Sequence, residues 1–282
     1  MKTTTKQGLV AAAWLLTLFG VIGGALLWQR QVRRPKQPIA AITVGSTTRL
    51  PTVLLLDAKT TSEQRRQFAA GLQRNNGSQS ILNAKVTTHG HVSFSGQFKD
   101  YDTRPCLQLI LPTKTASLKQ QAVWLKKGLE QAQKALKFKQ FNLVSYGTGG
   151  LVATTYLEEP TGAPQPKHLV AIATPFNGTS LRLNNNETTP VKRANQTNGL
   201  ESLIAKQLNI KTKIRVMLIA GQAKGQSNGD GVVPIQSALA GQTIYRPIVK
   251  DYQQAVLNTW RASHTGMYDS WKLANLIQNF IN

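Results

Sequence analysis

Short runs of consecutive apolar residues recur along the chain from residue 50 onward, and longer polar stretches separate them. Runs that are apolar at successive positions are typical of strands in a parallel sheet that is covered on both faces. We predict five such strands, at residues 52–56, 106–111, 142–146, 168–173 and 214–220.

Helical patterns lie between and after these runs. Within residues 117–136 apolar side chains recur at spacings of three and four, which predicts an amphipathic helix with a lysine-rich outer face. A second helix is expected at residues 270–281. Strands that alternate with helices predict an α/β fold with a mostly parallel, doubly wound sheet.

Two segments depart from this alternation. Residues 80–98 alternate polar and apolar positions on both sides of His89-Gly90-His91, which predicts a β-hairpin excursion with two turn histidines. Residues 179–210 are polar and rich in asparagine before they become helical, and we interpret them as a lid-like insertion over the carboxyl edge of the sheet.

The amino-terminal part of the chain has a different pattern. Residues 8–28 carry no charge, and these 21 residues are enough to cross a hydrocarbon core of about 30 Å as a helix. The alternative is a cleaved signal peptide, whose apolar part is usually shorter, at roughly 7–15 residues. We therefore expect a single-pass membrane anchor within residues 1–36, a polar linker at 37–49 and one domain at 50–282.

The chain is strongly basic, with 34 Lys and Arg against 12 Asp and Glu and a net charge of +22. All the acidic residues and 28 of the basic ones lie in residues 37–282, so that part alone carries +16. This excess favours an anionic neighbour such as a membrane surface, an anionic lipid or an anionic wall polymer. No nucleic-acid-binding motif is present, so nucleic acid is not an expected partner.

The few cysteine and histidine residues limit the chemistry further. One cysteine, Cys106, excludes an intrachain disulfide and a cysteine-rich zinc site, and four histidines leave little for a histidine-based one. We expect neither a metal nor another cofactor.

One motif points to a reaction centre. Residues 141–159 (FNLVSYGTGGLVATTYLEE) indicate a strand, a tight glycine turn and a helix, which is the context of the nucleophile elbow G-x-S-x-G. The small residues that such a turn needs are present at Gly149 and Gly150, but the position of the nucleophile is occupied by Gly147. Ser145 belongs to the strand, and Thr148 normally contributes its backbone N–H, so neither is a convincing substitute nucleophile.

Five segments of the domain resemble a known family. They are RPCLQLIL (104–111), NLVSYGTGGL (142–151), HLVAIATPFNG (168–178), NGDGVVPIQSALA (228–240) and SHTGMYDS (263–270). In these segments the chain resembles the uncharacterised α/β-hydrolase family of Gram-positive, lactic-acid-bacterium type, membrane-anchored cell-surface hydrolases. The resemblance implies an α/β-hydrolase fold and a body outside the cell, whereas the more basic carboxyl-terminal flank of the apolar run weakly favours the inside.

The resemblance also implies roles for individual residues. Asp230 is the catalytic acid, His264 is the catalytic base, and Gly147 stands in the place of the nucleophile, with Thr148 and Gly149 forming the elbow and its oxyanion donor. From the residues alone, Asp230 is also a good turn residue and His264 an ordinary surface histidine.

A second departure follows the first strand. The family has a His-Gly pair that shapes the oxyanion hole, and this chain has Leu56 and Asp57 instead. A carboxylate there opposes a developing oxyanion.

These observations leave three hypotheses open. The first is a degenerate hydrolase that lacks its serine and acts by binding a small-molecule or ester ligand or a partner. The second is an active acyl-ester hydrolase, similar to an esterase or lipase, that uses Asp230 and His264 with a water or a substitute nucleophile. The third is a surface protein that acts through its charge.

Overall fold

The computed structural model describes residues 50–282, apart from residues 75–76, 78, 98, 100, 113–115, 160–163 and 227–228. The predicted anchor at 1–36 and linker at 37–49 lie outside these residues. The described residues belong to one compact unit, residues 43–282. In the part that the structure describes, no helix combines the length and the apolar character that crossing a bilayer requires.

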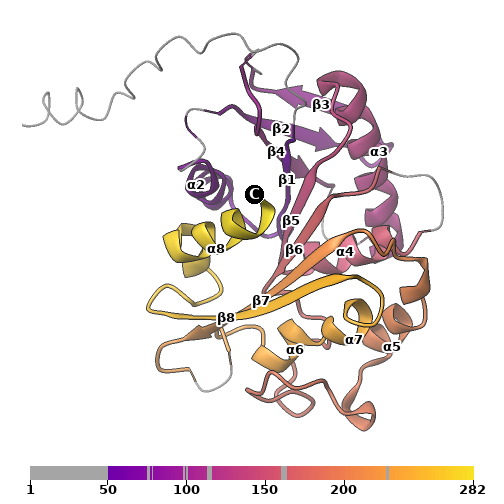
Figure 1. Cartoon of the computed structure of the whole chain (residues 1–282), viewed down its shortest axis with the longest axis vertical. Helices are drawn as coiled ribbons and strands as arrows, with labels where there is room; N and C mark the ends of the chain where they lie inside the picture. The colour runs from indigo at the N-terminus through magenta and orange to yellow at the C-terminus, as the bar shows by residue number, and fades with distance from the viewer. Residues whose placement is uncertain are drawn as a thin grey trace, which may run out of the picture. The chain divides into compact units, whose positions relative to one another are not determined.

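An eight-stranded sheet forms the centre of the unit at residues 43–282 (Figure 1). Its order is β3-β2-β4-β1-β5-β6-β7-β8, and every neighbouring pair is parallel except β2 and β3. The strands are β1 (Thr52–Leu55), β2 (Ile81–Val86), β3 (Val92–Ser95), β4 (Cys106–Ile110), β5 (Asn142–Tyr146), β6 (His168–Ile172), β7 (Arg215–Ala223) and β8 (Asp251–Thr259).

Helices cover both faces of this sheet. Figure 1 shows α2 and α8 together on one face and the remaining α-helices on the other. The helices are α2 (Ser62–Gln73), α3 (Leu118–Leu136), α4 (Thr148–Leu157), α5 (Asn198–Ile204), α6 (Ile235–Leu239), α7 (Gln242–Tyr245) and α8 (Trp271–Ile281), with short 3-10 turns η1 (Arg193–Asn195), η2 (Gln207–Asn209) and η3 (Gly266–Asp269).

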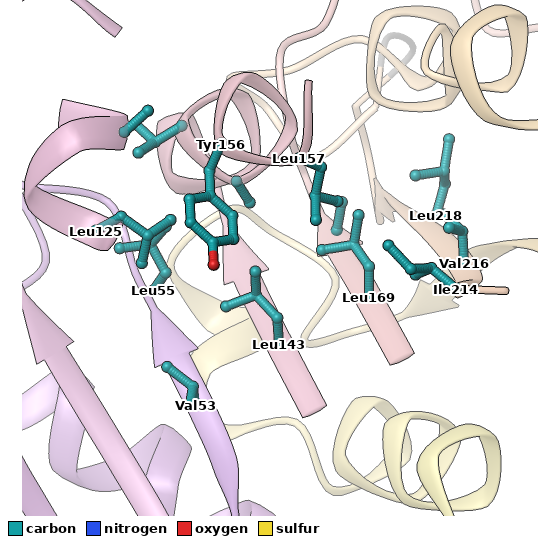
Figure 2. Close-up of a cluster of buried hydrophobic side chains, with 14 of the residues drawn as sticks. Val53, Leu55, Leu125, Leu143, Tyr156, Leu157, Leu169, Ile214, Val216 and Leu218 are labelled. Atoms are coloured by element: carbon teal, nitrogen blue, oxygen red, sulfur yellow. The ribbon is translucent and has the colours of Figure 1, made fainter. Parts of the chain in front are cut away.

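The two covered faces explain the continuous apolar strands. In β1, Val53 and Leu55 belong to the core under α3 and α4, whereas Leu54 belongs to the core under α2 and α8. Figure 2 shows the first core, in which Leu125 of α3 and Tyr156 of α4 lie over the strands. Each large side chain that is fully buried in this way stabilises the fold by roughly 1.5–3 kcal/mol.

Most of the predicted elements are present. The five apolar runs correspond to β1, β4, β5, β6 and β7, and the two predicted helices are α3 and α8. Both helices begin at a serine whose hydroxyl accepts a backbone N–H: Ser117 from Gln120 (3.2 Å) and Ser270 from Leu273 (3.3 Å). The mostly parallel α/β fold is therefore confirmed.

The hairpin differs from its prediction as an excursion. Strands β2 and β3 pair antiparallel as expected, but β2 also pairs in parallel with β4, so the hairpin is the edge of the main sheet. The cause is the inward row of Leu82, Ala84 and Val86, which is buried against the helical layer. The indole N–H of Trp124 in α3 donates to the carbonyl of Thr88 (3.1 Å) and fixes the turn there.

The segment at 179–210 lies against the helical layer rather than over the sheet edge. Gln236 and Gln242, of α6 and α7, donate to the carbonyls of Thr189 (3.4 Å) and Thr188 (3.0 Å). Among the described residues, no hydrogen bond links this segment to Gly147 or His264. A polar sequence can satisfy its backbone groups through side-chain amides, and that is how this segment is held.

Candidate functional site

The turn after β5 has the geometry of a nucleophile elbow. Gly147 has φ 55° and ψ −131°, and α4 begins at the next residue. A Cβ at Gly149 would lie 2.3 Å from the carbonyl oxygen of Leu55, and one at Gly150 would lie 1.9 Å from the hydroxyl of Thr174. The helix therefore approaches the strands too closely for any side chain at these two positions, as the motif predicts.

The apex of this elbow is filled by a side chain from the loop that follows β1. Asp57, just beyond β1, accepts the backbone N–H of Thr148 (3.3 Å) and the Thr148 hydroxyl (2.9 Å) on Oδ2. Its Oδ1 accepts the backbone N–H of Lys59 (2.8 Å). A Cβ added at Gly147 would lie 3.0 Å from Asp57 Oδ2. The carboxylate thus occupies the space beside the missing side chain and binds the N–H that follows the nucleophile position.

The two other expected site residues are in contact. Nδ1 of His264 lies 2.7 Å from Oδ2 of Asp230, and the His264 backbone N–H donates to the Asp230 carbonyl (2.9 Å). The Asp230 side chain is fully buried, and its Oδ1 accepts the backbone N–H groups of Val232 (2.9 Å) and Val233 (2.7 Å). The imidazole is 17% exposed, so it connects a fixed carboxylate to the surface.

A pair of buried tyrosines lies beneath this site. The rings of Tyr146 and Tyr268 stack with centroids 4.5 Å apart, and the Tyr146 hydroxyl donates to the carbonyl of His264 (2.5 Å). Burial raises the pKa of both phenols, and the charges of Asp57 and Asp230 raise the pKa of each further. Both carboxylates therefore lie near the same neutral aromatic floor. Sequence reasoning missed this floor because the two tyrosines are distant in the chain, and neither of the segments that contain them indicates that the rings stack.

The substitute nucleophiles are placed as the sequence suggests. Ser145 is fully buried, and its hydroxyl donates to the carbonyl of Val170 (3.1 Å), so it faces away from the elbow. The hydroxyl of Thr148 is bound to Asp57. In the described part of the chain, no group of three His, Cys, Asp or Glu residues could hold a metal ion.

Taken together, the geometry contains an elbow, a histidine and an acid, but no oxygen nucleophile at the apex. The catalytic roles of Asp230 and His264, and of the elbow residues Thr148 and Gly149, stay predictions. The adverse Asp57 was visible in the sequence as a departure. Its hydrogen bonds with Thr148 depend on how β1 lies beside β5 and could not be read from the chain.

Solved structures of similar architecture are known. The product of the Listeria innocua gene lin2722 is 24% identical, with a TM-score of 0.75, and the match covers 83% of this chain and 94% of that one. A Lactobacillus plantarum protein named as a candidate cell surface hydrolase is 20% identical, with a TM-score of 0.68, and the match covers 84% and 92% of the two chains. At these identities the likeness shows the fold alone. No functionally curated protein is significantly similar to the chain.

The sequence itself matches a family model over the whole described domain. The match covers residues 41–282, and the family is described as an alpha/beta hydrolase of unknown function. The fold, the elbow and the order of the site residues agree with this assignment. The chain therefore belongs to the alpha/beta hydrolase family of unknown function DUF915.

Proposed function

We propose that this protein is a hydrolase-fold binding protein that has lost serine-type acyl transfer. The observation that carries the proposal is the Asp57 carboxylate, which is bound to the N–H of Thr148 beside a glycine at position 147. The elbow thus lacks the attacking oxygen, and the N–H that would stabilise an oxyanion already donates to a carboxylate.

The energies favour this conclusion over a weakened serine mechanism. Removing one oxyanion-hole donor costs about 2.7–4 kcal/mol of transition-state stabilisation in known hydrolases. Here the donor is occupied, and two unit negative charges about 4 Å apart repel by about 4 kcal/mol at an effective dielectric constant of about 20. An oxyanion formed beside Asp57 would therefore be destabilised by more than the loss of its donor alone.

The alternative is an active acyl-ester hydrolase in which His264 and Asp230 activate a water. The contact of 2.7 Å between the two side chains and the partial exposure of the imidazole favour it. Removal of a triad serine elsewhere leaves only weak residual catalysis, so any such rate is expected to be low.

We further propose that the binding protein acts at the cell surface, on a single-pass anchor within residues 1–36 with the body outside the cell. The uncharged run at 8–28, the family resemblance and the name of the Lactobacillus plantarum relative support this location. A small-molecule or ester ligand in the old site, together with an anionic lipid or wall polymer near the basic body, is the proposed set of partners.

A hydrolysis assay tests the loss of catalysis. Residues 43–282, which contain both hydrophobic cores, are incubated with a panel of short- and long-chain acyl esters beside His264→Ala and the matched control His89→Ala. Equal background rates for all three proteins are expected, and any ester that binds without cleavage should raise the melting temperature. Turnover that disappears only in His264→Ala would refute the binding proposal and establish the alternative.

A further inference from the structure

Exposed apolar side chains gather at the carboxyl edge of the sheet, around the candidate site. Of the eight large apolar side chains that are exposed in the described part of the chain, three follow the carboxyl ends of β7 and β8. These are Val232 (53% exposed), Trp260 (73%) and Trp271 (53%), the last of which is the first residue of α8. Single exposed apolar residues are ordinary on a protein surface, so the grouping rather than the exposure is informative.

The two tryptophans belong to one internally braced loop, residues 260–271, which we call the Trp loop. Arg261 forms an ion pair with Asp269 and also donates to its backbone carbonyl (3.2 Å). The Arg261 guanidinium lies 4.3 Å from the centre of the Trp260 ring. This brace joins the two ends of the loop, next to Trp260 at one end and two residues before Trp271 at the other.

Basic side chains accompany both indoles. Lys272 lies 5.8 Å from the centre of the Trp271 ring. Ala223 of β7 pairs with Thr259 of β8, and the exposed Lys224 and Trp260 directly follow these two paired residues. The acid of the Trp loop, Asp269, is already paired with Arg261. The edge therefore places amphipathic rings beside the positive charges of Lys224 and Lys272.

Indole rings favour the boundary between lipid headgroups and acyl chains, and Lys and Arg are attracted to anionic headgroups. We propose that the carboxyl edge of the sheet docks on an anionic lipid bilayer, with Trp260 and Trp271 of the Trp loop entering the headgroup region. This inference goes beyond the proposed binding function, because it specifies the partner surface. Since His264 lies on the same loop, the candidate site would face the lipid.

The chain is long enough to permit this orientation beside its own predicted anchor. Residues 29–49 separate the uncharged run from the domain and can span at most roughly 75 Å when extended. The nine residues of β8 span about 30 Å. The chain enters the domain at the start of β1, the opposite edge, and still has the length to let the carboxyl edge reach the bilayer.

Vesicle binding tests the proposal. Residues 43–282 are sedimented with vesicles of equal parts phosphatidylglycerol and phosphatidylcholine, and with pure phosphatidylcholine. The double variant Trp260→Ser/Trp271→Ser should bind the anionic vesicles at least about tenfold more weakly than the wild type. The control Leu208→Ser changes an even more exposed side chain (82%) and should bind like the wild type. Lys224→Ser/Lys272→Ser should lose roughly fivefold per residue, whereas Lys211→Ser/Lys213→Ser, at the opposite edge, should lose less.

A spectroscopic readout distinguishes this partner from others. Brominated lipid should quench the tryptophan fluorescence of the wild type and not that of the double tryptophan variant, in which Trp124 is buried. Equal vesicle binding by the wild type and that variant would overturn the proposal. So would binding to a soluble polyanion without binding to vesicles, or self-association that disappears in that variant. None of these results depends on ester turnover, so the proposed function and this inference fail separately.

Discussion

The substitution Gly147→Ala probes the contact between the elbow and Asp57 with a single added carbon. The new Cβ would lie 3.0 Å from Asp57 Oδ2 and 3.3 Å from its Cβ, so the aspartate must move by a few tenths of an ångström. The backbone conformation, with φ 55°, is strained for any residue with a side chain and costs about 1–3 kcal/mol. We expect Gly147→Ala to lower the free energy of unfolding by about 2–3 kcal/mol.

A double-mutant cycle separates crowding from backbone strain. Asp57→Gly removes the whole side chain and its hydrogen bonds with Thr148 and Lys59, which should cost about 2 kcal/mol in the wild-type background. In the Gly147→Ala background, Asp57→Gly also relieves the contact. The loss of stability in the double variant should therefore be about 1 kcal/mol smaller than the sum of the losses in the two single variants. Gly225→Ala is the matched control, because Gly225 has φ 79° and open space around its Cβ position.

Urea unfolding of residues 43–282 with three single variants (Gly147→Ala, Gly225→Ala and Asp57→Gly) and two double variants (Gly147→Ala/Asp57→Gly and Gly225→Ala/Asp57→Gly) measures these terms. The Gly147–Asp57 pair should show the coupling, and the Gly225–Asp57 pair should be additive. Full additivity of Gly147→Ala with Asp57→Gly would mean that Asp57 does not fill the apex, and the reasoning about the blocked elbow would fail with it.

Three further predictions concern buried ionisable groups, each measured by urea unfolding as a variant minus wild type. Burial raises the pKa of Glu158 to about 8 from 4.5, so the fold favours the neutral form and loses stability as pH rises through that interval. The free energy of unfolding of Glu158→Gln should exceed that of the wild type by about 2 kcal/mol at pH 7, after allowance for screening, and should equal it near pH 4. Burial lowers the pKa of His168 to about 4 from 6.5, so its neutral form stabilises the fold above that interval and this contribution is lost as pH falls through it. His168→Asn should remove that loss. If the free energy of unfolding of the variant fell as steeply with decreasing pH as that of the wild type, the assignment would be contradicted. Asp230→Ala should lower the free energy of unfolding by about 2–4 kcal/mol. Asp230→Asn should lower it by less, because the asparagine oxygen can still accept the two backbone N–H groups that Asp230 binds. Equal losses in the two variants would show that those hydrogen bonds contribute little.

Strand β8 and helix α2 are two of the elements that escaped sequence reasoning, and they did so for a common reason. Strand β8 is an edge strand, and its Gln253 and Gln254 are exposed, so its sequence contains no apolar run that predicts a strand. Helix α2 buries only one side, chiefly Phe68, Ala69 and Leu72, within an otherwise polar sequence. Elements that are half solvated carry a weak apolar signal, whereas the doubly covered strands carry a strong one.

The candidate site divides in the same way. The elbow was readable because its glycines are close in the chain and a sharp turn requires them. The contact between Asp230 and His264 was expected only from the family resemblance, since 34 residues separate the two. The occupation of the Thr148 N–H by Asp57 depends on tertiary packing, and no local pattern in residues 54–61 expresses it.

Labelling with a fluorophosphonate, read by intact mass spectrometry, tests the central claim most directly. The proteins are the wild type, Gly147→Ser, Asp57→Gly and Gly147→Ser/Asp57→Gly, all as residues 43–282. The account expects a label only on the double variant, because the introduced serine supplies the nucleophile and the loss of the aspartate side chain frees the N–H of Thr148 that Asp57 now holds. A labelled wild type, or a double variant that stays unlabelled while folded, would contradict the account of an intact elbow that lacks its nucleophile and is blocked by its own aspartate.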